Sequence, residues 1–375
     1  MIWDVVIAGA GPAGSVAALV LARAGRRVLL LESGVGEERK VGESLPGAAR
    51  PLLRDLGLLP LLERGGHALS YGNLSAWGSG ELIAVDFIRD PNGPGWHLDR
   101  AKFDAGLREA ALAAGAVAMR GRGSGAVRDG NRWMITSGGE TIAARWMVDA
   151  TGRRATLARS AGAVRRRDPH LVALYAWALS GTGNGDSRTL VESAPDGWWY
   201  TSRLPDGTRV VALHVDAGEA APILRAPGAW EELLSRTIHV RRMLGDAVFP
   251  EAPRGTEACG ARLDRFAGDG WLAVGDAALS FDPLSSQGIF NALYAGLRGG
   301  RAIDAALSGA PGAIASYTRR LEEIRAAYLR HHDLFYRSEE RWSDRPFWRR
   351  RHGWQEKGER LEMVSLSGIG EPQEG

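Results

Sequence analysis

Lysine is nearly absent from this chain of 375 residues. Only Lys40, Lys102 and Lys357 occur, so arginine carries almost all of the positive charge. The formal net charge of +3 is too weak over this length to indicate a nucleic-acid partner. The single cysteine, Cys259, excludes an intrachain disulfide and a multi-cysteine metal site. We therefore expect no bound metal, and we interpret Cys259 as a small buried residue.

Long apolar runs are also missing. The apolar stretch Val16–Leu21 is far shorter than the roughly 20 residues that cross a bilayer. The first ten residues have the composition of a buried strand and not of a secretory signal. We therefore expect a soluble chain of the cytoplasmic type, without a membrane partner.

Glycine and tryptophan are instead abundant. The chain has 50 glycines, and its 13 tryptophans outnumber the 8 phenylalanines and the 7 tyrosines. Hydrophobic residues make up 45% and charged residues 24%, as in ordinary globular proteins. At roughly 150 residues per domain, the length indicates two domains, or two with an appendage.

The first motif is a glycine-rich turn between a strand and a helix. Asp4–Ala8 are expected to form a buried parallel strand, and the turn Gly9–Gly14 opens a helix over Ser15–Ala24. A second strand over Arg27–Leu31 ends at Glu32. This context, more than the glycine spacing itself, predicts a dinucleotide-binding Rossmann unit.

Each glycine of that turn has a physical role. Gly9 permits the tight turn, Gly11 lets the backbone approach a pyrophosphate, and Gly14 lets the helix pack on the strand. The free N–H groups of the helix N-terminus favour phosphate, and Glu32 can accept hydrogen bonds from ribose hydroxyls. The glycine-dense segment 121–125 has no helix behind it, so we expect only one permanently bound dinucleotide.

The chain then leaves this unit and returns to it. We expect helices over about 46–64, 230–244 and 288–307, alternating strands over 171–215, and a helical, arginine-rich segment over 313–360. The pattern predicts an α/β fold in three parts. These are a discontinuous Rossmann-type domain (1–65, 97–165 and 260–310), an inserted β-sheet substrate domain (66–96 and 166–259), and a C-terminal helical segment with a tail (311–375).

Three motifs together resemble the FAD-dependent monooxygenase superfamily of the para-hydroxybenzoate hydroxylase type. They are the turn Gly9–Gly14 with Glu32, the turn Asp149–Gly152, and the segment Val274–Ala278. The resemblance covers about residues 4–303 and implies FAD as the cofactor of the Rossmann-type domain. It also implies that Asp276 lies at the ribityl–phosphate end of FAD.

The segment 282–291 resembles the turn that passes the edge of the flavin ring in this superfamily. Backbone contacts from Gln287, Gly288 and Ile289 are implied there, because helix N–H groups stabilise the negative charge of reduced flavin. Two further motifs, 42–46 and 96–104, resemble the halogenase and geranylgeranyl reductase branch, in which the arginine at the position of Arg100 contacts FAD. The alternative for Arg100 is a solvent-exposed side chain behind an N-capping Asp99.

The resemblance implies a set of residues around FAD. The set is Gly9, Gly11, Pro12, Ala13, Gly14, Glu32, Ser33, Glu43, Ser44, Arg100, Val127, Thr151, Gly152, Gly275, Asp276, Pro283, Gln287, Gly288 and Ile289. A reduced nicotinamide, NAD(P)H, would visit only transiently as the reductant.

Halogenases of this branch use a lysine in the substrate tunnel, and this chain departs from that pattern. No lysine occurs between Ser44 and Trp96, and arginine is a poor substitute because its guanidinium stays protonated. The Trp-x-Trp-x-Ile-Pro motif would align on Tyr200–Pro205, where both tryptophans are missing, and Ser285 stands where a glutamate is expected. These departures disfavour halogenation of tryptophan.

A closer likeness is to flavoprotein hydroxylases of tryptophylquinone cofactor biogenesis. It rests on Trp77–Ser79, Gly197–Tyr200, and the tail motifs Arg341-Trp342 and Pro346–Arg351. The resemblance implies an NAD(P)H- and O2-using monooxygenase that hydroxylates a tryptophan side chain of a protein or peptide partner. A small-molecule hydroxylase or reductase of natural-product biosynthesis and a non-catalytic flavoprotein maturation factor remain alternatives.

The sequence leaves the catalytic residue open. Glu43, His97, Trp199 and His214 are candidates, the histidines because their ordinary pKa suits proton transfer. Each has a structural alternative, either as a satisfied polar group or as a packed core residue. Arginines interleaved with aromatics between 330 and 354 are typical of protein interfaces and predict a docking surface for the partner. Packing of the same aromatics on the domain is the alternative.

Overall fold

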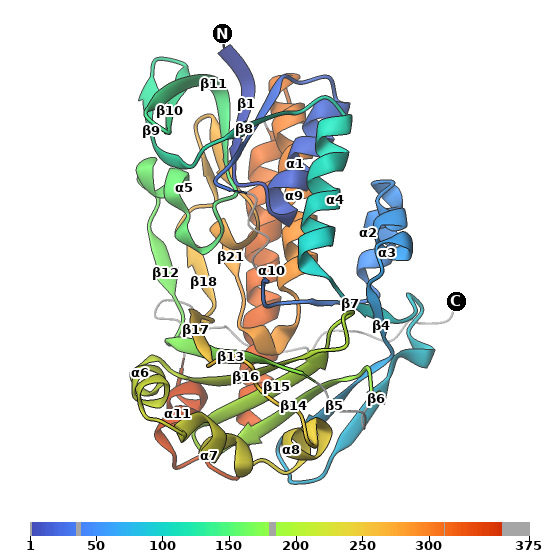
Figure 1. Ribbon diagram of the computed structural model, residues 1–375. Coiled ribbons are helices and arrows are strands. Elements are labelled where there is room, and N and C mark those ends of the chain that lie inside the picture. Colours follow the sequence, from blue (N-terminus) through green and yellow to red (C-terminus); the bar gives the residue numbers. More distant parts are fainter. Residues whose placement is uncertain (1, 35–38, 180–184, 311, 355–375) are drawn as a thin grey trace, which may run out of the picture.

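The computed structural model describes residues 2–34, 39–179, 185–310 and 312–354, and it confirms the predicted α/β fold with an inserted sheet (Figure 1). A nucleotide-binding sheet lies above a seven-stranded sheet in this view, with two three-stranded sheets between them. No helix of the described residues is long and apolar enough to span a membrane.

The nucleotide-binding sheet has a parallel centre because its apolar strands are buried on both faces. Val5, Val6, Ile7 and Ala8 are fully buried, and β1 lies parallel between β11 and β2. In spatial order the strands are β19 (Ala267–Gly268), β20 (Trp271–Ala273), β11 (Glu140–Asp149), β1 (Ile2–Ala8), β2 (Val28–Glu32) and β8 (Val117–Arg120). The hairpin β9 (Gly123–Asp129) and β10 (Arg132–Ser137) extends β11.

Small residues let the helices on this sheet approach closely. A Cβ added at Gly296 of α9 (Gly288–Leu307) would lie 2.3 Å from the carbonyl oxygen of Ala13 in α1 (Pro12–Arg23). Figure 1 shows α1 and α9 side by side, next to α4 (Arg100–Ala113) and α10 (Gly312–Arg337). The two N-termini of α1 and α9 are thereby brought to one end of the sheet.

The seven-stranded sheet is built from residues 72–86 and 171–257. In spatial order its strands are β17 (Arg254–Glu257), β13 (Leu171–Ala178), β16 (Arg209–Asp216), β15 (Gly197–Arg203), β14 (Thr189–Ala194), β5 (Gly72–Ala76) and β6 (Ile83–Asp86). All neighbours are antiparallel except β14 and β5. Its outer face is covered by α6 (Ala217–Arg225), α7 (Ala229–Ser235) and α8 (His239–Leu244).

The remaining elements are two three-stranded sheets, short helices and 3-10 turns. One small sheet joins β12 (Arg165–Arg167), β18 (Ala261–Leu263) and β21 (Leu279–Ser280), and the other joins β3 (Ser44–Leu45), β7 (Gly95–His97) and β4 (Ala68–Ser70). The short helices are α2 (Ala49–Asp55), α3 (Leu59–Arg64), α5 (Thr156–Ser160) and α11 (Pro346–His352). Single 3-10 turns occur at η1 (Phe87–Arg89), η2 (Gly152–Arg154), η3 (Gly275–Ala277) and η4 (Pro283–Ser285).

Three helices are shorter in the structure than the sequence predicts. The helix expected over 46–64 is divided into α2 and α3, because Gly57 has a φ of 65° that ends the first helix. The helix expected over 230–244 is two helices, since Glu192 accepts the N–H groups that begin α8. The helix expected over 313–360 ends at Arg337, and Pro346 begins α11 after an intervening turn. Residues 355–375, which include the predicted tail, lie outside the described residues.

Candidate active site between the phosphate-binding turn and the seven-stranded sheet

A cavity of about 400 Å³ lies where the two domains meet. Its walls are the start of α1, the segment before β3, the turn that precedes α9, and the inner face of the seven-stranded sheet. Most of the residues that the sequence predicts around FAD line it. They are Gly11, Pro12, Ala13, Glu43, Ser44, Arg100, Gly152, Asp276, Pro283, Gln287, Gly288 and Ile289.

The glycines of this cavity leave room for a large group against the backbone. A Cβ added at Gly11, Gly152 or Gly288 would meet no atom within 4 Å. The N-termini of α1 and α9 both open into the cavity, and their free N–H groups favour negative charge. A cradle with two such helix ends fits a dinucleotide that carries both a pyrophosphate and a ring with negative charge, as FAD does.

Other predicted FAD residues lie beside the cavity or away from it. Gly9 and Gly14 serve the turn itself, because a Cβ at Gly14 would lie 1.9 Å from the carbonyl oxygen of Gly9. Glu32 ends β2 and lies 3.6 Å from Arg108, and the hydroxyl of Thr151 donates to Asp149 at 2.7 Å. Gly275 lies between the lining residues Val274 and Asp276, and Ser33 is not part of the lining.

Val127, which the resemblance implies beside FAD, does not line the cavity. It lies in the β9–β10 hairpin opposite Met134 and is 69% exposed, away from the cavity lining. The residue of this hairpin that approaches the first strand is Gly123, whose added Cβ would lie 2.9 Å from the side chain of Ala8.

Arg100 lies in the cavity lining, and the N-capping role of Asp99 that the sequence offered as part of the alternative is also present. Asp99 caps α4 by accepting the N–H of Lys102 at 3.1 Å. Arg100 still lines the cavity, where its guanidinium donates to the carbonyl of Gly42 at 2.7 Å and to the carboxylate of Asp104. This arginine thus fixes the backbone that presents Glu43.

Glu43 is a buried carboxylate of the cavity lining. It is only 2% exposed, and it accepts hydrogen bonds from the hydroxyl of Tyr200 at 2.5 Å and from that of Ser202. Burial and the charge of Glu43 raise the pKa of Tyr200 well above its ordinary value, so Tyr200 is a neutral donor. The pair offers a proton route in which Tyr200 takes a proton from the cavity while passing its own to Glu43.

The four catalytic candidates separate into two that line the cavity and two that do not. Glu43 and His214 line it. His97 is buried with both ring nitrogens engaged, by the carbonyl of Arg203 at 2.9 Å and the hydroxyl of Thr189 at 3.0 Å. Trp199 points to the outer face of the sheet and packs against Trp230 at 4.9 Å between ring centroids. The alternation of side chains along a strand is the reason.

His214 is a neutral ring between the cavity and the protein interior. Burial lowers its pKa to about 4. Its ring stacks flat on Trp198 with 3.6 Å between centroids, and its Nδ1 has no hydrogen-bond partner among the described residues. Trp198 itself is fully buried.

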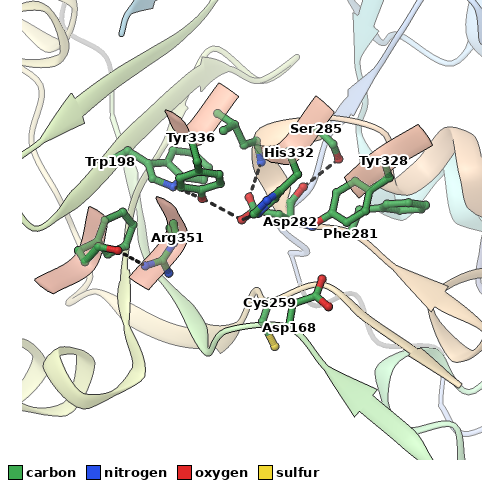
Figure 2. A network of polar contacts seen from close by, with 12 residues as sticks. Asp168, Trp198, Cys259, Phe281, Asp282, Ser285, Tyr328, His332, Tyr336 and Arg351 are labelled. Carbon is green, nitrogen blue, oxygen red and sulfur yellow. Dashed lines mark hydrogen bonds and ion pairs between the residues drawn. The ribbon is translucent and has the colours of Figure 1, made fainter. Parts of the chain in front are cut away.

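Sequence reasoning missed the polar network behind this stack, which Figure 2 shows. The indole N–H of Trp198 donates to Tyr336 at 3.0 Å, and the hydroxyl of Tyr336 donates to Asp282 at 2.8 Å. Asp282 also lies 3.5 Å from His332 and lines the cavity. Tyr336 and Asp282 are 54 positions apart in the chain, so no local pattern could have joined them.

The lysines lie elsewhere. Lys40 binds Asp104 at 2.9 Å and Lys102 binds Asp99 at 3.2 Å, whereas Lys357 falls outside the described residues. Neither described lysine lines the cavity. Ser285, at the place of the expected glutamate, does line it and donates to the carbonyl of Asp282 at 2.8 Å.

The arginine-rich C-terminal segment packs on the seven-stranded sheet. Arg345 binds Asp196, and Arg350 and Arg351 both bind Asp216. A second cavity of about 610 Å³ lies under this segment on the outer face of the sheet, with Trp199 and Leu213 in its lining. The phosphate-binding turn and the turn before α9 do not contribute to it, so the smaller cavity is the candidate active site.

Comparison with known proteins gives a consistent family for most of the chain. The family described as tryptophan halogenase matches residues 88–366, and an FAD binding domain matches residues 3–59. LodB of Marinomonas mediterranea, which is named as an FAD-dependent oxidoreductase, is 30% identical over 368 residues that cover 94% of this chain and 97% of LodB.

Two similar solved structures are enzymes with different reactions, a halogenase and a tryptophan dihydroxylase. The myxobacterial chondrochloren halogenase CndH has a TM-score of 0.86 at 26% identity, covering 95% of this chain and 87% of CndH. The peptidyl tryptophan dihydroxylase QhpG, essential for tryptophylquinone cofactor biogenesis, has a TM-score of 0.71 at 27% identity, covering 94% and 79%. The halogenase is the nearer of the two by fold, whereas the sequence resemblance placed the hydroxylases closer.

Proposed function

This chain belongs to the tryptophan halogenase family of FAD-binding oxidoreductases, and within that family we propose that it is an oxygenase that hydroxylates an electron-rich aromatic ring of the indole type. The proposal concerns the reaction and the substrate. FAD would be held by the lining residues Gly11, Asp276 and Gly288, which leave the space that such a cofactor needs.

The observation that carries the proposal is the chemistry of the cavity lining. It has a hydrogen-bonded tyrosine–glutamate pair and a neutral histidine, and it has no lysine among the described residues. The cavity lining therefore offers no lysine amine among the described residues that could deliver an electrophilic halogen. Both arginines of the lining already have partners within the chain: Arg100 donates to Gly42 and Asp104, and Arg153 donates to the carbonyls of Cys259 and Phe281.

The residues of the cavity suit proton transfer at the ring. Hydroxylation converts an aromatic C–H, O2, NAD(P)H and a proton into C–OH, NAD(P)⁺ and water. When bound, FAD supplies the oxygen and hydride chemistry. Tyr200 would take the proton released by the ring and pass its own to Glu43, with Ser202 holding the carboxylate in place.

We also propose that the ring belongs to a tryptophan side chain of a protein or peptide partner. QhpG, a peptidyl tryptophan dihydroxylase, supports this extension. Arg350 and Arg351 are held by Asp216 within the chain, so the predicted docking role falls to Arg349, whose guanidinium contacts only the carbonyl of Asp344 among the described residues. Arg349→Ala should weaken partner binding with FAD content unchanged, and unchanged binding would remove the docking role.

Halogenation of an aromatic ring is the second candidate function. It is favoured by the family match and by the TM-score of CndH. It requires a route for the electrophilic halogen that does not use a lysine of the cavity lining.

One assay separates the two reactions. The FAD-loaded enzyme is supplied with reduced nicotinamide, O2, bromide and a tryptophan-containing peptide, and the product is identified by mass. Gain of one oxygen atom without bromine supports hydroxylation. Replacement of a ring hydrogen by bromine supports the second candidate and contradicts the proposal. Omitting bromide serves as the control, because a hydroxylase keeps its product and a halogenase loses it.

A further inference from the structure

Four of the 13 tryptophans gather with Tyr336 behind the candidate active site. Trp198, Tyr336, Trp77, Trp348 and Trp342 form one connected group of rings, in which Tyr336 also contacts Trp348 directly at 6.1 Å between ring centroids, and we refer to these five as the aromatic chain. Trp77 lies 6.3 Å from Trp198, 5.9 Å from Tyr336 and 5.3 Å from Trp348 between ring centroids. Trp342 stacks on Trp348 at 6.1 Å.

The chain begins at the cavity. His214 lines the cavity and stacks on Trp198 with 3.6 Å between ring centroids. The imidazole of His214 is therefore the only ring between Trp198 and the cavity among the described residues. Trp198 and Tyr336 are fully buried and joined by the 3.0 Å hydrogen bond shown in Figure 2. The inner end of the aromatic chain is therefore dry and fixed.

The chain ends near the surface. Trp348 is fully buried, whereas Trp77 and Trp342 are partly exposed. The guanidinium of Arg341 covers the ring of Trp342 at 4.2 Å. The rings thus run without a break from a buried site at the flavin-side cavity to solvent, and no centroid separation along the way exceeds 6.3 Å.

We infer that the aromatic chain carries single electrons from the protein surface to the cavity. Indole and phenol side chains lose one electron far more readily than aliphatic side chains, and rings in near contact exchange electrons rapidly. Packing alone explains why these rings are buried. It does not explain why a core of aliphatic residues, which fills space equally well, is replaced by a series of oxidisable rings that reaches both the cavity and the solvent.

The inference rests on the proposed function, because the oxidant is a peroxide-level product of O2 formed in the cavity when no substrate is present. Each step moves one electron toward the cavity, and a low-molecular-weight thiol at the surface then reduces the oxidised outer ring, Trp342. Two thiols supply two electrons and two protons, so that hydrogen peroxide becomes two waters and the thiols become one disulfide. The aromatic chain itself is unchanged after each cycle.

Tyr336 has the proton acceptor that such a step needs. When it loses an electron, its phenolic proton can move along the 2.8 Å hydrogen bond to Asp282 and return when the electron is replaced. Burial alone raises the pKa of Asp282, but hydrogen bonds from His332 and its other partners lower it below the ordinary value, so Asp282 is a carboxylate that can accept the proton.

The test uses light in place of O2, so it does not depend on hydroxylation. The protein loaded with oxidised FAD is excited by a blue flash without O2, and the tryptophan radical is followed by transient absorption. Trp198→Phe should lose the long-lived radical signal. Trp199→Phe, the neighbouring and equally buried tryptophan of the same strand, is the matched control and should retain the signal.

The outer end of the chain gives a second measurement. A thiol added to the wild-type protein should shorten the lifetime of the radical, and Trp342→Phe should abolish that shortening. Trp77→Phe, at a partly exposed ring, should retain the long-lived signal, because Tyr336 still contacts Trp348 directly at 6.1 Å between ring centroids. Equal signals from wild type and Trp198→Phe, or an unchanged effect of thiol in Trp342→Phe, would overturn the inference. A protein that brominates its substrate and yet shows the loss in Trp198→Phe alone would overturn the proposed function and leave the electron path standing.

Discussion

The two faces of the seven-stranded sheet are made from alternate residues of the same strands, and they differ in chemistry. Trp198, Tyr200 and Ser202 face inward, toward the FAD-side cavity, where Tyr200 and Ser202 donate to Glu43. Trp199 and Thr201 face outward, and Trp199 packs under α7 and α8. Inward residues such as Ala173 and Ala212 are small and leave room, while outward ones such as Leu174 and Leu213 fill a core.

The difference shows that one strand can serve reaction and stability separately. Neighbouring residues of similar type acquire unlike roles because the side-chain period of a strand is two. Substitutions on the inner face should therefore change turnover more than folding, and substitutions on the outer face should do the reverse. Paired variants on β15 test this distinction.

The largest effect is expected at Tyr200. Tyr200→Phe keeps the ring and removes the proton route to Glu43, so turnover should fall by about 10²- to 10⁴-fold. Product formation by mass spectrometry measures this, with FAD content as the control for binding. Thr201→Val is the matched variant on the outer face. Its hydroxyl has no partner among the described residues, so turnover and stability should both be kept. Wild-type turnover in Tyr200→Phe would contradict the role of the inner face.

The outer face is tested by Trp199→Ala. This residue is 1% exposed and packs against Trp230. Its removal should lower the free energy of unfolding by about 3 to 5 kcal/mol, which denaturant titration measures. Turnover per folded, FAD-loaded molecule should stay near the wild-type value. A large loss of turnover with unchanged stability would place Trp199 in the reaction and reverse the distinction.

His214 gives the inner face a pH signature. Burial lowers its pKa from 6.5 to about 4 in the folded protein, whereas the unfolded chain keeps the ordinary value. As the pH falls from 6.5 to 4, the unfolded chain binds a proton at His214 that the folded chain does not, so the free energy of unfolding decreases. At pH 4, the contribution of His214 lowers the free energy of unfolding by about 3 kcal/mol relative to neutral pH.

His214→Phe should remove that contribution while keeping a ring on Trp198. Urea titrations at several pH values between 7 and 4 compare the two proteins, and the difference in slope belongs to His214. Identical slopes would mean that the imidazole is not held neutral by its surroundings.

The smallest effect is expected at Glu192, on the outer side. Its carboxylate accepts the N–H groups of Ile238 at 2.7 Å, His239 at 2.9 Å and Val240 at 2.7 Å, and so caps α8. Glu192→Ala should lower the free energy of unfolding by about 1 kcal/mol, as the loss of a helix cap usually does. Thermal unfolding detects this change, and turnover of the folded protein should not move with it.

The nucleotide-binding half could be predicted from the sequence because its signals are local. Gly9, Gly11 and Gly14 lie within six positions, and their spacing alone states which backbone atoms need room. The short strands on either side are uniformly apolar, so their place in a parallel sheet follows.

The substrate-side half could be predicted only in part. Alternation shows that Trp198 and Tyr200 share a face, but it does not tell which face meets the cavity, and Trp199 was therefore a wrong candidate. The partners of Glu43, at Tyr200 and Ser202, lie more than 150 positions away. Contacts of that range depend on how the two domains meet, and no local pattern encodes them.

The oxygenase proposal is tested most directly by labelling the oxygen. The FAD-loaded enzyme turns over a tryptophan-containing peptide with reduced nicotinamide under ¹⁸O2 in ordinary water, and the product is analysed by mass and fragmentation. The account predicts one ¹⁸O atom on the indole ring for each hydroxylation. A hydroxyl that takes its oxygen from water, or a ring that carries a halogen in place of oxygen, would contradict it.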